Sequence, residues 1–389
     1  MKMKAEKIFL SLLFMGMASA DLLQNPDFES PPANLKGNST SSFMLLSQSN
    51  EVPGWTFEGT IQYVTASQDT SLLENGHAIQ LCQDGKISQT FIANGGITDY
   101  VLTFAVAPGD RNCSHHVYVV ISVPHSTKVF SLKQQYGKET WERYGHYLGS
   151  WGEGEPVNLV FQSIRVESNP NTKCWPVIDS LLLKSVGTLS DANDNLLPNG
   201  GFETGPDFLS NSTGGILLAE NIPSAFQSPL KLWYVLGTVK YIDSKNFFVP
   251  QGNAAIEIVS GVSAGIQTEV ILKKGSKYSL EFTLGDANDT CVGDFVVGAQ
   301  TGSTSQNFSL ASNGTGSAKK FSLTFKAKTS ATPISFLSYT TIQTRDGVYC
   351  GPVVDDVVLR ASYGMKLEMQ LKVLIYLYIL GAILYFLWR

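Results

Sequence analysis

Four acidic residues occupy matching places in the two halves of the 389-residue chain. Glu29 and Asp179 in the first half correspond to Glu203 and Asp355 in the second. A pair of carboxylates is the usual acid and base of a glycosidase. An active site seldom persists intact in both copies of a duplicated unit, however, which argues against catalysis here. The plainer alternative is that these carboxylates accept backbone hydrogen bonds where the first and last strands of each half meet.

The histidines form no catalytic pattern, although all five lie in the first half of the chain. They are His77, His115, His116, His125 and His146. No Asp-His-Ser spacing or G-x-S-x-G motif accompanies them. The adjacent pair His115 and His116 is a poor metal site, because neighbouring residues of a strand point to opposite faces. We therefore predict no catalytic residue and a protein that is not an enzyme.

Aromatic side chains are better functional candidates, because flat apolar rings can stack on sugar rings without any bond being broken. Trp141, Trp151 and Trp175 have no counterpart in the other half, so we treat them as candidate sugar-stacking residues on an exposed surface. The alternative is packing between sheets. It is supported by Tyr144 of the same stretch, which aligns with the strand position Phe321.

An internal duplication organises the chain, because three motifs recur in the same order at a nearly constant offset. The motifs are N-x-x-F-E, W-x-x-x-G-T-[IV] and C-[GW]-P-V-[IV]-D. They begin at Asn25, Trp55 and Cys174 in the first half and at Asn199, Trp233 and Cys350 in the second. We predict two copies of one domain at residues 21–186 and 195–361, joined by a polar linker at 187–194. The recurring tryptophans are then expected in the two cores.

The sequence pattern of each copy predicts a series of short strands. Residues 100–106 and 278–284 alternate with period two, and residues 117–123 form a run rich in β-branched side chains. Many short strands separated by Gly, Asn, Ser and Pro favour a sandwich or a jelly roll. We therefore predict an all-β fold made of two tandem jelly-roll sandwiches.

Four of the five cysteines also recur. In an oxidising compartment this repetition predicts one disulfide per domain, Cys113–Cys174 and Cys291–Cys350. Cys82 has no counterpart, and we interpret it as a buried free thiol, with an intermolecular disulfide as the alternative. No two cysteines are close enough in sequence to form a zinc knuckle.

The two ends of the chain indicate secretion and attachment to a membrane. Residues 1–20 combine a basic start, a short apolar run and small residues at the cleavage positions, as in a secretory signal peptide. Residues 362–389 begin with small residues, continue with a polar spacer and end in an apolar tail, the order of a GPI-attachment signal. We predict lipid attachment at Ser362, with Ala361 and Gly364 as alternatives. A short membrane anchor is the alternative to the lipid.

The composition fits an extracellular protein. The net charge is -5 and no basic stripe occurs, which excludes the nucleic-acid-binding class. Sequons in a secreted chain predict surface glycosylation. Five of them are at Asn38, Asn211, Asn288, Asn307 and Asn313. A sixth, at Asn112, is less favourable because its middle residue is Cys113.

The recurring motifs resemble those of the plant cell-wall proteins of the "domain of unknown function 642" family. The second copy matches best, with N-L-L-P-N-G-G-F-E at residues 195–203 and C-G-P-V-V-D-D at 350–356. The first copy departs at Trp175, where the family usually has glycine, and at residues 82–85. The resemblance extends over essentially the whole mature chain. It implies two galactose-binding-like β-sandwiches in the wall or apoplast, associated with wall polysaccharides and pectin-modifying enzymes.

The resemblance also bears on the repeated acids. Many galactose-binding-like sandwiches hold a structural calcium ion between their first and last strands, and calcium prefers several oxygen ligands. Calcium held by Glu29, Asp179, Glu203 and Asp355 is therefore an alternative to backbone hydrogen bonding. No other cofactor is expected.

Together these observations predict a non-catalytic protein in the wall or at the outer face of the plasma membrane. It would bind cellulose, hemicellulose or pectin, or a wall enzyme such as pectin methylesterase. One alternative is an enzyme that acts on wall glycans. The other is a structural or signalling ectodomain with no sugar affinity.

Overall fold

The computed structural model describes thirteen stretches of the chain: residues 22–33, 43–47, 51–66, 76–109, 113, 117–132, 136, 140–164, 174–187, 195–210, 212–219, 227–259 and 261–362. The predicted signal peptide, most of the linker and the tail after Ser362 lie outside these residues. So do His115, His116 and the sequons at Asn38, Asn112 and Asn211. The described stretches contain no α-helix, and hence none that is long and apolar enough to cross a membrane.

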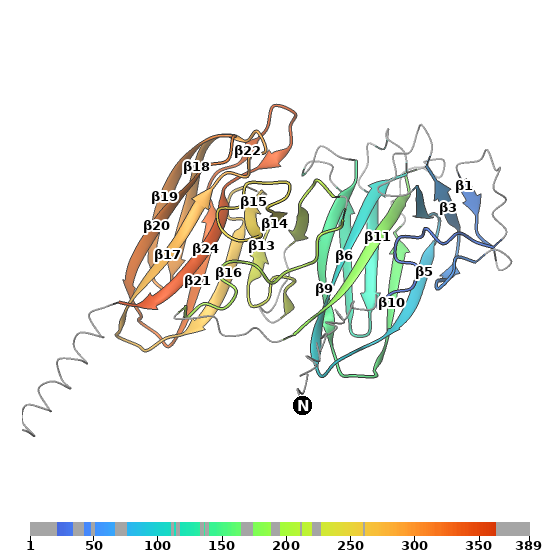
Figure 1. Cartoon of the computed structure of the whole chain (residues 1–389), viewed down its shortest axis with the longest axis horizontal. Coiled ribbons are helices and arrows are strands. Elements are labelled where there is room, and N and C mark those ends of the chain that lie inside the picture. The colour runs from blue at the N-terminus through green and yellow to red at the C-terminus, as the bar shows by residue number, and fades with distance from the viewer. Residues whose placement is uncertain are drawn as a thin grey trace, which may run out of the picture.

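The first domain consists of two facing sheets, shown in blue to green on the right of Figure 1. One sheet has the order β1-β3-β4-β11-β6-β9, and the other has the order β2-β5-β10-β7-β8. The bounds are β1 Phe43–Leu45, β2 Thr56–Glu58, β3 Ile61–Thr65, β4 His77–Leu81, β5 Lys86–Ile92, β6 Thr98–Pro108, β7 Val117–Val123, β8 Ser126–Leu132, β9 Glu142–Trp151, β10 Pro156–Ser163 and β11 Pro176–Val186.

The second domain repeats this arrangement, in yellow to red on the left of Figure 1. Its sheets have the orders β12-β14-β15-β24-β17-β20 and β13-β16-β21-β18-β19, with a small β22-β23 pair beside them. The bounds are β12 Ile216–Ala219, β13 Tyr234–Leu236, β14 Thr238–Asp243, β15 Ala254–Ile258, β16 Gly265–Ile271, β17 Lys277–Gly285, β18 Val292–Thr301, β19 Thr304–Asn313, β20 Ala318–Lys326, β21 Ala331–Ser338, β22 Ile342–Gln343, β23 Tyr349–Cys350 and β24 Val353–Ala361.

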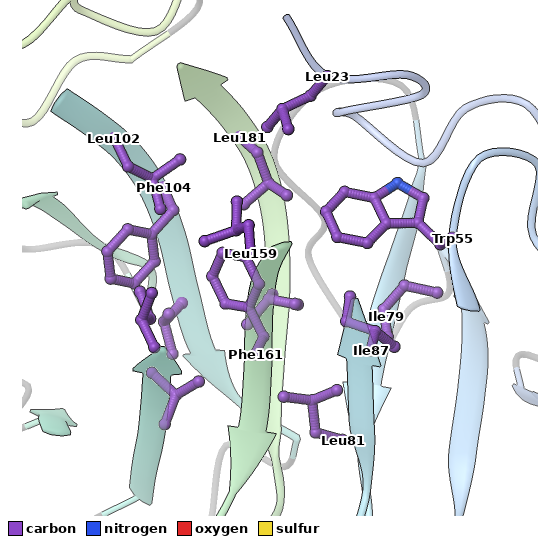
Figure 2. Close-up of a cluster of buried hydrophobic side chains, with 14 of the residues drawn as sticks. Leu23, Trp55, Ile79, Leu81, Ile87, Leu102, Phe104, Leu159, Phe161 and Leu181 are labelled. Atoms are coloured by element: carbon purple, nitrogen blue, oxygen red, sulfur yellow. The ribbon is translucent and has the colours of Figure 1, made fainter. Parts of the chain in front are cut away.

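Alternating strands bury one face each, which explains why these sequences form sandwiches. In β7, every second side chain from Val117 to Val123 is buried, and the residues between them are half-buried. Figure 2 shows how Trp55, Phe104 and Phe161 meet aliphatic side chains from several strands in the first core. Each such side chain stabilises the fold by about 1.5–3 kcal/mol relative to remaining exposed.

The two cores are built in the same way. Phe104 stacks on Tyr144 at 5.7 Å and meets Phe130 edge-on at 5.0 Å. In the second domain, Phe282 stacks on Phe321 at 6.0 Å and meets Phe308 edge-on at 5.1 Å. The structure confirms the all-β prediction and the two tandem β-sandwiches. It also confirms Trp55 and Trp233 as buried core residues, at 4% and 0% exposure.

Both predicted disulfides are confirmed, Cys113–Cys174 and Cys291–Cys350. Cys82 is a buried free thiol, as predicted. Burial raises the pKa of the Cys82 thiol to about 11. The thiol is therefore protonated at neutral pH and a weak nucleophile.

The larger sheets of the two domains join into one sheet of twelve strands. The junction is a parallel contact between β9 and β12, with Leu217 opposite Tyr144. Gly145 makes this approach feasible, because a Cβ atom there would lie 2.6 Å from Leu218 Cδ2 and 2.8 Å from Pro206 Cγ. The two sandwiches are thus joined directly as well as by the linker.

Candidate functional site

The repeated glutamates bind the backbone at the start of a neighbouring strand. Glu29 Oε1 accepts the His77 N–H at 2.9 Å, and Glu29 Oε2 lies 2.7 Å from His77 Nδ1. Glu203 Oε1 accepts the N–H groups of Asn253 at 2.8 Å and Ala254 at 3.4 Å. Gly252 allows this approach, since a Cβ atom there would lie 2.0 Å from Glu203 Oε1.

The repeated aspartates stabilise an irregularity in the last strand of each domain. Asp179 and Asp355 each accept the N–H of the next residue at 2.6 Å, and those next residues, Ser180 and Asp356, have positive φ values of 52° and 49°. Asp355 also accepts the Gln251 N–H at 2.8 Å. The pairing register shifts at these points, as expected for a β-bulge. Burial raises the pKa of the Asp355 carboxyl to about 7.

These contacts bear on the predicted calcium site. Among the described residues, no three His, Cys, Asp or Glu side chains come together in an arrangement that could hold a metal ion. The oxygens of all four acids face N–H donors, which satisfy a carboxylate as well as a cation would. The geometry therefore fits the hydrogen-bonding alternative, and calcium stays a prediction.

The three described histidines have three different environments. His77 pairs with Glu29 and stacks on Tyr63 at 5.1 Å. His125 lies in the tight turn between β7 and β8, with a φ of 68°. His146 is buried on β9, where burial and the nearby Lys128 lower its pKa to about 3.

The candidate stacking residues do not form one surface. Trp141 is 6% exposed and packs on the outer face of the first domain's larger sheet, in a cluster with Ala105 and Val177. Trp151 is half-buried against Phe91 and Tyr100, at the other end of β9. Trp175 is half-buried next to the disulfide residue Cys174. Trp141 and Trp151 are separated by the length of a strand, because each strand residue advances about 3.3 Å.

A pocket between the two domains is a candidate site to which both domains contribute. We call it the interdomain pocket, and its volume is about 290 Å³. It begins beside the β9–β12 junction, and both domains contribute to its wall. The lining residues are Tyr136, Trp141, Glu142 and Arg143 of the first domain and Thr213, Gly214, Gly215, Leu217, Lys240, Phe247, Asn288, Asp289, Thr290, Thr344 and Val348 of the second. Aromatic rings and charged groups therefore face the same space.

The charged groups of the interdomain pocket already have partners. Lys240 Nζ lies 2.9 Å from Glu257 Oε2, with both side chains buried, and 5.9 Å from the Phe247 ring. Glu142 accepts the Tyr144 hydroxyl at 2.6 Å, and Asp289 accepts the Cys291 N–H at 3.2 Å. Burial raises the pKa of the Glu257 carboxyl. Carboxylates engaged in this way serve binding and orientation better than acid–base catalysis, which needs groups that reach the substrate's proton.

Comparison with known proteins identifies the family of the chain. A family model described as "Protein of unknown function (DUF642)" matches residues 21–184 and 195–360. The chain belongs to the DUF642 family. The resemblance drawn from the repeated motifs is therefore confirmed.

Curated relatives of this DUF642 chain come from Arabidopsis thaliana. Protein DUF642 L-galactono-1,4-lactone-responsive gene 1 is 32% identical over 354 residues, which is 87% of this chain and 91% of the relative. Protein DUF642 L-galactono-1,4-lactone-responsive gene 2 is 33% identical over 349 residues, which is 87% of this chain and 90% of the relative. Protein TEEBE is 31% identical over 349 residues, again 87% of this chain and 90% of the relative.

Some solved structures are also similar, at low identity. The tandem CBM22-1–CBM22-2 domain of Xyn10C from Paenibacillus barcinonensis has a TM-score of 0.27 and 14% identity, with 82% of this chain and 97% of that chain covered. A TmCBM61 complex with β-1,4-galactotriose has a TM-score of 0.28 and 19% identity, with 43% of this chain and 99% of that chain covered.

Several lining residues of this DUF642 chain were missed from the sequence. No motif singled out Arg143, Lys240, Phe247 or Asp289 as functional residues, and they lie in different domains. Phe247 was detectable in part, because the second copy has an aromatic pair at 247–248 that the first copy lacks. The sequence could not show that both domains line one pocket, because this depends on the pairing of β9 with β12.

Proposed function

We propose that this protein binds cell-wall polysaccharide without cleaving it, through the interdomain pocket. The observation that carries the proposal is the composition of that pocket, where Trp141, Tyr136 and Phe247 share one space with Arg143 and Lys240. Saccharide sites need apolar rings for the C–H faces of the sugar and a few polar groups for its hydroxyls.

The size of the pocket limits what can enter it. A volume of about 290 Å³ is at the lower end of the range for small-molecule sites. We infer that about one or two sugar units of a polymer occupy it, while the rest of the polymer lies outside. A site made by both domains would also depend on their mutual position. Polysaccharide binding should therefore require the tandem arrangement.

The predicted location supports this function. The sequons at Asn307 and Asn313 are exposed and do not line the interdomain pocket, as glycosylation compatible with binding there requires, whereas a glycan at the exposed Asn288 would lie at the pocket wall. Ser362 directly follows β24, so a GPI lipid attached there would hold the second domain close to the membrane. Secretion, glycosylation and lipid attachment are all parts of the proposal. Release of the protein from intact cells by a phospholipase tests the lipid, and retention after treatment would favour a membrane anchor.

The test is retention of the mature glycosylated protein on cellulose, hemicelluloses and pectins. We expect retention on at least one polysaccharide, reduced about tenfold in Phe247→Ala, which removes a ring from the pocket wall. The matched control is Phe43→Ala, since Phe43 is 38% exposed on β1 and does not line this pocket.

Three results would redirect the proposal. If neither variant loses retention, the binding site lies elsewhere on the molecule. No retention on any polysaccharide would leave a protein partner, such as pectin methylesterase, as the function to test by pull-down. Release of reducing sugar from a bound glycan would instead indicate an enzyme, and Glu142→Gln and Asp289→Asn would then identify its carboxylates.

A further inference from the structure

The second domain carries a cluster of lysines at the end where β24 finishes. Lys273 and Lys274 lie in the connection from β16 to β17, and Lys328 lies in the connection from β20 to β21. Lys277 begins β17 and lies directly opposite Lys326, the last residue of β20. We call these five residues the basic end, and all five side chains are exposed.

Hydrogen bonds join the parts of the basic end into one surface. The Gly275 N–H donates to the Ala327 carbonyl at 2.8 Å, and the Ala327 N–H donates to the Ser276 carbonyl at 3.0 Å. The two connections that carry lysines are therefore held side by side. The Ser362 N–H donates to the Lys277 carbonyl at 3.0 Å, so the chain leaves β24 from within the basic end.

The equivalent end of the first domain has the opposite charge. Two matching hydrogen bonds, to the hydroxyls of Tyr100 and Tyr278, mark the connections that correspond. In the first domain, residues 94–99 and 152–155 contain three acids and no lysine or arginine, whereas the basic end has five lysines and no acid. The three acids are Asp99, Glu153 and Glu155. The positive charge therefore belongs to the second domain alone and not to the duplicated fold.

Folding of the domain does not explain these lysines. Like charges directly opposite each other on neighbouring strands destabilise a sheet, as Lys277 and Lys326 do here. In the part of the chain that the structure describes, no carboxylate forms an ion pair with any of the five ammonium groups. Of the acids on the adjoining strands, Glu281 is paired with Arg360 at 3.2 Å, and Glu269 lies two residues before the end of β16. Protection of an edge strand accounts for Lys326, but the other four lysines lie outside β20.

The position of the basic end indicates which surface it faces. From Ser362 the chain continues to an uncharged apolar stretch at residues 373–388. Under either form of the proposed membrane attachment, the lipid or the anchor, this end of the second domain is the end nearest the membrane. The sequons at Asn288 and Asn313 lie at the opposite end, near Cys291, so glycans there would leave the basic end uncovered.

We propose that the basic end binds the phosphate groups of anionic lipid headgroups and so holds the second domain against the membrane surface. This inference rests on the membrane attachment in the proposed function, since that attachment brings the cluster to the surface. Lysines close to an anionic lipid surface each strengthen binding, and clusters of about this size beside a membrane attachment point bind acidic lipids. Ammonium groups suit this task, because they bind phosphate as point charges on flexible side chains.

The experiment measures binding of residues 21–362 to lipid vesicles. This is the chain that attachment at Ser362 would leave, prepared without the lipid. Both hydrophobic cores are formed by residues between Leu23 and Leu359, so the chain contains the complete fold. We expect it to bind vesicles of phosphatidylcholine with phosphatidylinositol about tenfold more tightly than vesicles of phosphatidylcholine alone. The difference should disappear as the salt concentration rises, because salt screens exposed charges.

Two double variants locate the binding on the molecule. Lys273→Gln with Lys274→Gln removes two charges from an exposed loop and should weaken binding to the anionic vesicles about tenfold at an unchanged unfolding temperature. The matched control, Lys245→Gln with Arg345→Gln, removes two exposed charges outside the basic end and should bind like the parent. Lys277→Gln should weaken binding and raise the unfolding temperature, because it relieves the repulsion between β17 and β20.

Equal binding to the two kinds of vesicle overturns the inference, and so does a control variant that loses as much binding as the Lys273 and Lys274 variant. Binding to polygalacturonate that depends on these two lysines, without binding to vesicles, also overturns it and assigns the basic end to acidic wall polysaccharide. Vesicle binding in this experiment uses no attached lipid. Failure of polysaccharide retention or of phospholipase release therefore contradicts the proposed function, whereas failure of vesicle binding alone contradicts only the role of the basic end.

Discussion

Strand β9 of the first domain and strand β20 of the second domain are structurally equivalent. Strand β9 forms the interface between the domains, whereas β20 is an open edge of the sheet. The outer face beside β9 is covered by the second domain, where Thr103 Oγ1 donates to the Asp207 carbonyl at 2.9 Å and Lys184 Nζ lies 2.5 Å from Asp207 Oδ1. At the interface, Lys231 also pairs with Asp99. Beside β20 nothing in the described chain covers the same face. There Lys320 pairs with Asp356 at 2.8 Å, and Arg360 pairs with Glu281 at 3.2 Å.

The same architecture allows β9 to join the second domain and keeps β20 from pairing with another strand. Strand β9 carries Gly145 at the contact, which permits another chain segment to approach. Strand β20 carries Lys319, Lys320 and Lys326 along its exposed edge, and lysine on an edge strand opposes further strand pairing. The cores beneath both strands are alike, so the choice is made by a few side chains on the outer face.

The largest expected effect concerns the disulfides, which close loops of nearly equal length. Their sequence separations are 61 and 59 residues, so the chain-entropy model predicts a loss of about 4 kcal/mol of unfolding free energy from either one. The second should cost more, because Cys291 and Cys350 also pack on Phe295. Chemical denaturation of the two double Cys→Ser variants measures this. A smaller loss from Cys291→Ser with Cys350→Ser would show that the two domains are less alike than their cores indicate.

A second contrast is electrostatic and lies at the bulge of the last strand. Asp355 has Asp356 beside it, whereas Asp179 has Ser180, and the extra charge adds to the burial that raises the pKa of Asp355 to about 7. An acid with a raised folded-state pKa binds a proton in the folded state that the unfolded chain has already released. Stability should therefore fall as the pH rises from about 4 to about 7, by up to a few kcal/mol. Hydrogen exchange resolved by domain measures it, and Asp355→Asn should flatten the dependence; an unchanged slope would contradict it.

The smallest effect tests the interface and the open edge directly. Gly145→Leu should destabilise the interdomain contact by about 1–3 kcal/mol, because the new side chain meets Leu218 and Pro206. The matched change Ser322→Leu, which lies opposite Glu281 on the open face, should be nearly neutral. Small-angle scattering and thermal unfolding together report domain separation and stability. Equal behaviour of the two variants would mean that β9 and β20 do not differ as described.

Much of the fold was predictable because its signals are local and repeated. The alternation of residues 100–106 and 278–284 predicted what became β6 and β17. The recurrence of the four cysteines predicted both disulfides. The candidate sites were harder to predict from the sequence. Trp141 was correctly selected as a residue without a counterpart, but it lies under Leu209 of the second domain rather than on an open surface.

The duplication, the strands, the disulfides and the family could be predicted from the order of residues, because periodicity and recurrence are properties of that order. The pairing of β9 with β12, the pocket shared by both domains and the position of His146 at the place where Leu323 forms core became known from the three-dimensional structure. These features depend on contacts between residues far apart in the chain. Such contacts are set by the packing of whole sheets, and no local pattern encodes them.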